Sequence, residues 1–213
     1  MNENFKILKK KKFIDRVFDK MSIESKNIDT KKFEKVKSLN NFAFNKTLIS
    51  NAKIIIVGTL TPPEGMNNGY YYSSSKNKVF GILDKCLDSE NKLSKLKKEL
   101  YLNPKNKDII NSIEKLLFDY KIAFIDIIDN AIRIKNSSKD DDILMFSLDK
   151  KSFEYCNTNQ IFICTSKNAK DGLMEISQDK KVNIECSKIF VCHQDRFHFK
   201  LENWKDKLNL INN

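Results

Sequence analysis

Residues 53–60, KIIIVGTL, decide the fold because they have the composition of a strand that is buried on both faces. The run is short, continuous and apolar, is rich in β-branched residues, and ends near Gly58. Strands of a parallel sheet covered by helices on both faces have this composition, whereas strands with one solvated face alternate between apolar and polar residues. The stretch therefore predicts the start of a parallel sheet.

Three later stretches have the same character: residues 121–128 (KIAFIDII), 160–165 (QIFICT) and 188–192 (KIFVC). Helical patterns lie between and after them, over residues 79–87, over a Lys-rich region at 88–120 that divides near Asn103 and Pro104, over 166–176, and around Trp204. Strands that alternate with helices are typical of α/β folds with right-handed crossovers. We predict an α/β fold with three α/β/α layers around a central, mainly parallel four-stranded sheet.

The composition favours a basic protein of one main domain. The 213 residues include 39 Lys and Arg against 28 Asp and Glu, so the formal net charge is +11. Such an excess attracts polyanions because binding releases counterions from phosphates, and nucleic acid is the natural candidate. The alternative is compositional drift, since Lys, Asn and Ile dominate the whole sequence, as an AT-rich genome would produce.

Cysteine usage and hydropathy point to the cytoplasm. The five cysteines are odd in number and form no C-x-x-C pair, which suits reduced thiols. The basic N-terminus is not followed by the apolar stretch of a signal peptide, and no run approaches the roughly 18 apolar residues of a membrane span. We expect a cytoplasmic monomer that does not contact membranes.

The N-terminal residues differ from the rest of the chain. Apolar residues such as Phe13, Val17 and Met21 recur at spacings of four, and residues 9–12 form a cationic run. We predict a basic helical extension over 1–48 and an α/β domain over 49–213 with a helical insertion at about 88–118. The extension is either a solvated helix face or an arm that contacts nucleic acid.

Polar loops follow three of the predicted strands, over residues 59–77, 126–142 and 193–199. The first contains two of the three prolines of the chain. Loops at the carboxyl ends of parallel strands converge on one crevice, where open α/β sheets bind their ligands. The sequence therefore predicts a site built from these three loops.

The run VGTLTPPEG…GYYYSSSKNKVF, which spans the first loop, resembles the first motif of the uracil-DNA glycosylase superfamily, in particular its mismatch-specific and hypoxanthine types. That motif has a strand ending in Gly, a loop with Pro, and then a stretch like Tyr-Tyr-x-x-Pro-x-Asn-x-Phe-Trp. Tyr71, Tyr72 and Asn77 match its tyrosine and asparagine positions. Ser75 replaces the proline, and Val79 and Phe80 replace the last two aromatic residues.

The resemblance covers about residues 54–208 and leaves out the N-terminal extension. FIDIIDNAIR, with Asp126 and Arg133, and then Ser138 and the aspartates before Ile143 are similar to the Asp-Val…Arg…Ser…Asp segment of the family. The match is weaker at IFICTSKNA, where Ser166 replaces a glycine. The last loop, HQDRFHF, keeps only the first position of a His-Pro-Ser form, and it lacks the Pro-Ser that grips phosphates.

The resemblance implies a monofunctional DNA glycosylase, which hydrolyses the N-glycosidic bond of a damaged, deaminated or modified base flipped out of double- or single-stranded DNA. A uracil- or hypoxanthine-like base is implied, with no metal or organic cofactor. The reaction needs a positioned water, a stabilised sugar cation and donors for the departing base. The candidate catalytic residues are Asn77, Glu64 and His193.

Each of these candidates has a structural alternative: a helix cap for Asn77, a solvated loop carboxylate for Glu64 and a structural imidazole for His193. Asp126 and Arg133 are expected to pair and brace the second loop, and Arg196 and Phe197 to clasp a phosphate and fill the gap left by the flipped base. A zinc site at the cysteines and histidines near the C-terminus has unsuitable ligand spacing. The candidate substrate-binding residues are Gly58, Thr59, Thr61, Pro62, Tyr71, Tyr72, Phe80, Asp126, Arg133, Gln194, Arg196 and Phe197.

Two other functions remain open. The altered last loop is compatible with a non-catalytic nucleic-acid or nucleotide-binding protein on the same fold. A hydrolase of free nucleosides or nucleotides is the other alternative, and it would lack the steep salt dependence of a polyanion substrate.

Overall fold

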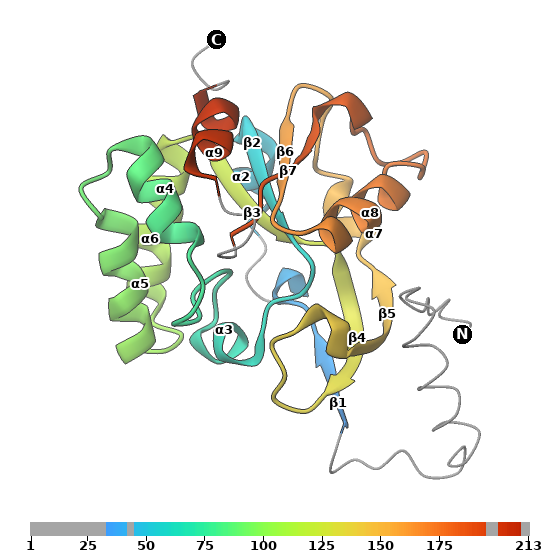
Figure 1. The fold of residues 1–213 in the computed structure, drawn as a ribbon, viewed down its shortest axis with the longest axis horizontal. Helices are drawn as coiled ribbons and strands as arrows, with labels where there is room; N and C mark the ends of the chain where they lie inside the picture. The colour runs from blue at the N-terminus through green and yellow to red at the C-terminus, as the bar shows by residue number, and fades with distance from the viewer. Residues whose placement is uncertain (1–32, 42–44, 195–199, 210–213) are drawn as a thin grey trace.

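The computed structural model describes residues 33–41, 45–194 and 200–209 (Figure 1). A four-stranded parallel sheet lies at its centre, with the strand order β3-β2-β6-β7. The strands are β2 (Ile54–Gly58), β3 (Ile122–Asp126), β6 (Ile161–Cys164) and β7 (Ile189–Val191). The predicted α/β fold with a four-stranded parallel sheet is therefore confirmed.

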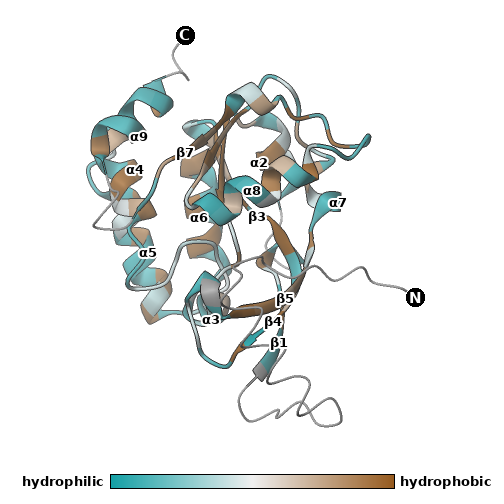
Figure 2. Cartoon of the chain, turned by 45° about the vertical axis from the view of Figure 1, so that its right-hand side comes forward, coloured by the Kyte–Doolittle hydropathy of each residue, from teal (hydrophilic) through white to brown (hydrophobic). Residues whose placement is uncertain are grey.

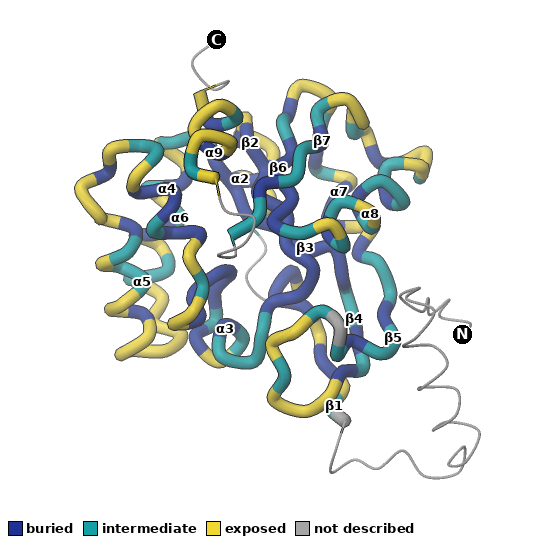
Figure 3. Tube along the Cα trace, in the orientation of Figure 1, coloured by how far each residue is buried: buried dark blue, intermediate teal, exposed yellow. Residues whose placement is uncertain are grey.

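Two neighbouring strands of this sheet, β2 and the edge strand β3, are apolar, and neither of their faces meets water. Every residue of β2 and β3 is buried, and the strands form the apolar centre of the molecule (Figures 2 and 3). Their register places Gly58 opposite Asp126, and Val57 pairs with Cys164 on the other side. The carboxyl ends of β2, β3 and β6 therefore lie side by side.

The chain reverses its direction across the sheet at β2. It passes from β2 to β3 on one side and then returns to β6 on the other side. In open α/β sheets such a switch point opens a crevice beyond the carboxyl ends of the strands, because the two connections leave in opposite directions. The crevice is expected beside Gly58 and Thr165, the residues that end or follow β2 and β6.

A second sheet, which the sequence pattern did not predict, is antiparallel with the order β1-β4-β5. Its strands are β1 (Phe33–Lys37), β4 (Ile128–Ile134) and β5 (Ile143–Leu148). Only Ile127 separates β3 from β4, so the chain leaves the parallel sheet and enters the antiparallel one almost without a loop. The predicted helical character of the N-terminal extension is wrong over β1, and residues 1–32, with their cationic run, lie outside the described residues.

The main helices agree with their predictions: α4 (Val79–Leu87), α5 (Lys92–Leu102), α6 (Lys107–Asp119), α8 (Lys167–Ile176) and α9 (Leu201–Leu208). The break between α5 and α6 falls at the expected Asn103–Pro104 region. Asn106 caps α6 by accepting from Asp108 N and Ile109 N, and Ser166 caps α8 by accepting from Ala169 N. Trp204 of α9 is completely buried.

Helices lie on both sides of the parallel sheet. In Figure 1, α4, α5 and α6 lie to its left, and α8 and the short α7 (Lys150–Phe153) lie to its right. α8 contacts β2, β6 and β7, whereas α6 and the short α2 (Lys46–Asn51) contact β3. Within the described residues, no helix is long and apolar enough to cross a membrane.

Candidate functional site

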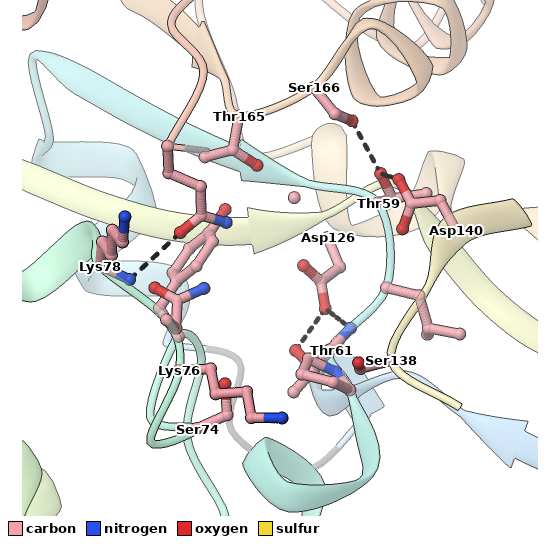
Figure 4. A pocket seen from close by; sticks show the side chains of 16 residues that line it. Thr59, Thr61, Ser74, Lys76, Lys78, Asp126, Ser138, Asp140, Thr165 and Ser166 are labelled. Atoms are coloured by element: carbon pink, nitrogen blue, oxygen red, sulfur yellow. Dashed lines mark hydrogen bonds between the residues drawn. The ribbon is translucent and has the colours of Figure 1, made fainter. Parts of the chain in front are cut away.

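A pocket of about 320 Å³ opens at the switch point of the parallel sheet (Figure 4). Its walls come from segments far apart in the chain: residues 58–62 after β2, Tyr72 and residues 74 and 76–78, Asp126, Ser138 and Asp140, Thr165 and Ser166, and Gln194. The three loops predicted to converge thus each contribute to one pocket, together with the end of β6.

The carboxyl group of Asp126 lies at the bottom of this pocket. Asp126 is the last residue of β3 and is 2% exposed. Its Oδ2 accepts hydrogen bonds from Thr61 N at 2.7 Å and Thr61 Oγ1 at 2.6 Å (Figure 4). Its Oδ1 lies beside Gly58, whose missing Cβ leaves room for it. One oxygen is therefore held, and the other faces the space above Gly58.

The environment of Asp126 raises the pKa of its carboxyl group to about 6. Desolvation by burial is the main cause, because a charged carboxylate loses its hydration there. The two Thr61 hydrogen bonds act in the opposite direction, while the charges of Asp140 and Asp149 raise the pKa further. A carboxyl group with this pKa is ionised at neutral pH and is more basic than an ordinary aspartate, as a general base requires.

The backbone of Asp126 is also hydrogen-bonded to Asn40, a residue outside the pocket lining. Asn40 donates from Nδ2 to Asp126 O at 2.7 Å and to Asp149 Oδ2 at 2.7 Å. Its Oδ1 accepts from Asp126 N at 3.2 Å and from the Tyr71 hydroxyl at 2.6 Å. Asn40 thus hydrogen-bonds to both the amide and the carbonyl of Asp126, where the chain leaves the parallel sheet.

Tyr72 provides the second polar group beside Gly58. Its backbone has a φ of 53°, and its ring packs edge-on against Phe124 with 5.0 Å between ring centroids. Its hydroxyl is buried and has no hydrogen-bond partner of normal geometry in the described part of the chain, although the Thr165 hydroxyl is close. Burial first, and then the charge of Asp126, raise the pKa of Tyr72 well above its usual value, so the hydroxyl stays a neutral donor.

Hydroxyl groups line the pocket at the amino end of α8. Thr59 Oγ1 donates to Asp140 Oδ2 at 2.7 Å and lies 3.1 Å from Ser166 Oγ. Thr165 Oγ1 donates to Val57 O at 3.2 Å. These contacts join the residues after β2 and β6 to the aspartate-containing loop before β5.

The opposite wall is cationic and carries an amide. Lys76 and Lys78 are exposed, and Asn77 lies between them. Asn77 Oδ1 accepts from Val79 N at 2.9 Å, although the N-cap position of α4 is Lys78 and not Asn77, so Nδ2 is the side-chain group that a ligand could meet. Lys97 of α5 braces this loop by donating from Nζ to Asn77 O at 2.5 Å. Burial lowers the pKa of Lys97, whereas the nearby Glu64 carboxylate opposes that shift.

Eight of the predicted site residues line the pocket: Gly58, Thr59, Thr61, Pro62, Tyr72, Asn77, Asp126 and Gln194. Other candidates lie outside its lining. Glu64 lies in the short helix α3 (Pro63–Asn68) and accepts from Ser75 Oγ at 3.2 Å, Phe80 is completely buried against Phe124, and the His193 carbonyl accepts from Trp204 Nε1. Arg196 and Phe197 lie outside the described residues.

The expected pairing of Asp126 with Arg133 is wrong. Arg133 Nε instead lies 2.8 Å from Glu34 Oε1 of β1, and its Nη1 donates to Thr61 O at 3.3 Å. Asp126 binds the amide and hydroxyl of the same Thr61. Both side chains therefore hydrogen-bond to Thr61 rather than to each other.

The sequence interpretation missed several pocket residues. Ser74, Lys76, Lys78 and Thr165 line the pocket, although none was a candidate. Thr165 is the last residue of a predicted buried strand, at the same end of the sheet as the predicted loops, so its position there could have identified it. Asn40 carries no such signal, because it lies in a segment assigned to the extension. In the part of the chain that the structure describes, no three His, Cys, Asp or Glu side chains form a group suited to a metal ion.

Comparisons of the chain with protein-family models, with curated proteins and with solved structures found no match.

Proposed function

We propose that this protein is a DNA glycosylase that hydrolyses the N-glycosidic bond of a uracil- or hypoxanthine-like base flipped out of DNA. The observation that carries the proposal is the Asp126 carboxyl group, which is buried at the bottom of a pocket at the switch point, with a pKa raised to about 6. Burying a carboxylate costs free energy, and groups in clefts whose pKa is strongly perturbed are concentrated at catalytic sites.

Asp126 is assigned the role of general base. Its Oδ2 is fixed by Thr61, so Oδ1 beside Gly58 would hold the attacking water. The water oxygen forms the new bond to the sugar C1′, its proton passes to Asp126, and the base departs with the electron pair of the broken C1′–N bond. The carboxylate also stabilises the positive charge that develops on the sugar. This role replaces the one expected for Glu64 and His193, which do not line the pocket.

The other wall suits the rest of a nucleotide. Lys76 and Lys78 would neutralise phosphates beside the flipped nucleotide, and the Asn77 amide would donate to the base edge. The pocket volume of about 320 Å³ lies at the lower end of the roughly 300–1,000 Å³ typical of small-molecule sites, as one nucleotide requires. The net charge of +11 favours a polyanionic substrate.

The resemblance of the first loop to the uracil-DNA glycosylase superfamily supports the same assignment. We infer membership of that superfamily and a three-layer α/β/α arrangement of the domain. The reaction assigned to Asp126 uses only protein side chains and water. The inferred partner is DNA, bound by a monomer.

The test is excision by the full-length protein. Duplex and single-stranded oligonucleotides, each with one uracil, hypoxanthine or other altered base, are incubated with the protein and then treated with alkali to cleave abasic sites. We expect strand cleavage for at least one base, and a loss of roughly 100- to 10,000-fold in rate for Asp126→Asn. Asp129→Asn is the matched control, because Asp129 is three residues away and does not line the pocket.

Each alternative function has its own outcome. Intact strands for every base contradict the proposal. Tight DNA binding without excision that is unchanged in Asp126→Asn indicates a binding protein. Release of bases from free nucleosides, with a rate that is indifferent to salt, indicates a nucleoside hydrolase.

A further inference from the structure

The Tyr72 hydroxyl is a buried polar group that makes no hydrogen bond of normal geometry within the described residues, although the Thr165 hydroxyl is close. The side chain of Tyr72 lines the pocket, the residue is 7% exposed, and its oxygen would lie 2.9 Å from a Cβ on Gly58. Buried hydroxyls in proteins are almost always hydrogen-bonded, so one that lies beside the pocket residue Gly58 without such a bond in the described residues indicates a group supplied by a ligand.

The backbone also holds Tyr72 in an unfavourable conformation. Its φ of 53° lies in the left-handed region, which an aromatic residue rarely adopts. By contrast with the Tyr72 hydroxyl, the hydroxyl of the neighbouring Tyr71 has a partner, because it donates to Asn40 Oδ1 at 2.6 Å. Such strain persists only where the surrounding structure imposes it, and it concentrates at ligand sites. The strained backbone of Tyr72, and a buried hydroxyl without a hydrogen bond of normal geometry in the described residues, both reduce the stability of the fold. This conformation nevertheless places the hydroxyl beside Gly58.

The chemistry of the space above Gly58 limits what this hydroxyl can bind. Asp126 Oδ1 lies on the same side of Gly58 and accepts hydrogen bonds, whereas the neutral phenol supplies a donor. Gly58 has no side chain, so a planar ring can approach the Tyr72 hydroxyl edge-on while Asp126 Oδ1 holds the water. A ring whose edge carries a carbonyl oxygen satisfies the Tyr72 donor, whereas an edge without an acceptor leaves its proton unpaired.

We propose that the Tyr72 hydroxyl donates a hydrogen bond to a carbonyl oxygen of the base in the pocket and so selects bases that carry an oxo group. The inference rests on the proposed function, because it takes a nucleobase as the ligand of this pocket. During excision the same hydrogen bond strengthens as negative charge develops on the departing base. Tyr72 is then a specificity-determining and catalytic residue rather than a stacking platform.

Binding of free bases tests the hydrogen bond without requiring excision. Hypoxanthine is compared with purine, and uracil with pyrimidine, because each pair shares a ring skeleton; the oxo member carries carbonyl oxygens and ring N–H groups where the other carries ring-nitrogen acceptors, so loss of the preference in Tyr72→Phe is what assigns it to this hydroxyl. We expect the full-length protein to bind the oxo base at least tenfold more tightly in one pair, measured by calorimetry, and Tyr72→Phe to abolish that preference. Equal affinities in the wild type, or a preference that survives in Tyr72→Phe, overturn the inference.

Folding separates this role from a structural one. Tyr72→Phe removes a hydroxyl without a partner, so its urea midpoint should equal or exceed that of the wild type. Tyr71→Phe is the matched variant, and its midpoint should fall because it removes a hydrogen bond to Asn40. A midpoint for Tyr72→Phe that falls as far as that of Tyr71→Phe indicates a structural hydroxyl and contradicts the proposal.

Excision distinguishes the failure of this inference from the failure of the proposed function. With 5-fluorouracil, a better leaving group than uracil, Tyr72→Phe should lose less rate than the roughly 100-fold expected for uracil. Excision that is unaffected by Tyr72→Phe contradicts the role of Tyr72 and leaves the glycosylase proposal intact. A Tyr72-dependent preference for oxo bases without any excision contradicts the glycosylase proposal and supports the binding role.

Discussion

The substitution Asp126→Asn should stabilise the protein at neutral pH while abolishing its proposed activity. The folded protein raises the pKa of this carboxyl group from 3.8 to about 6, mainly through desolvation. Below about pH 4 the group is neutral in the folded and unfolded states, so its burial is not penalised electrostatically. As the pH rises from 4 to above 6, the unfolded state releases the proton first, and the folded state loses roughly 3 kcal/mol of stability.

The geometry of the site explains why asparagine should be tolerated. The side-chain oxygen of asparagine can accept both hydrogen bonds from Thr61, and its NH₂ group can face the position of Oδ1 beside Gly58. The amide has no charge to desolvate at any pH. The free energy of unfolding of Asp126→Asn should therefore exceed that of the wild type by an amount that grows with pH.

Urea unfolding at steps between pH 4 and pH 8 measures this difference directly and requires no knowledge of the substrate. The difference between Asp126→Asn and the wild type should be small at pH 4 and approach roughly 3 kcal/mol above pH 7. Asp129→Asn, whose parent residue is partly exposed, controls for the removal of a negative charge. A difference for Asp126→Asn that does not change with pH would refute the raised pKa and remove the main support for a general base.

Three further substitutions test other parts of the site and the fold. Thr61→Val deletes a hydrogen-bond donor that stabilises the Asp126 carboxylate, so the pKa of Asp126 should rise and the acid limb of the pH profile of kcat/KM should move to higher pH. An unchanged limb would contradict the assignment of Asp126 as the general base. Gly58→Ala places a methyl group against Asp126 Oδ1 and 2.9 Å from the Tyr72 oxygen. Urea titrations should show a destabilisation of about 1–3 kcal/mol, and the pocket should no longer bind bases. Unaltered base binding would show that the base-binding pocket lies elsewhere. Asn45→Ala removes the cap of α2, and urea unfolding should show a loss of about 1 kcal/mol with base binding preserved; reduced binding would reveal a coupling that the contacts do not predict.

The parallel sheet could be predicted because its signal is local. Each strand is a continuous apolar run. Such a run, as in β2, indicates burial on both faces even when the neighbouring strands in the sheet are unknown. The antiparallel sheet could not be predicted in this way. β4 reads IDNAIRI, with three polar residues among its seven, and its first partner is β1, much earlier in the chain, where Phe33 pairs with Ile134. A strand of this kind becomes evident only when its partner is known.

The residue pattern was enough to predict that Gly58, Asp126 and Asn77 lie together at one edge of a parallel sheet, because they lie at or after the carboxyl ends of buried strands or in the loops that follow them. What each group can do there depends on the folded structure. The pKa of Asp126 depends on burial by the whole domain and on donors from Thr61, and among the described residues the hydroxyl of Tyr72, whose ring packs against Phe124, makes no hydrogen bond of normal geometry. Desolvation and hydrogen bonding depend on which distant segments come into contact, and no local pattern of residues encodes that.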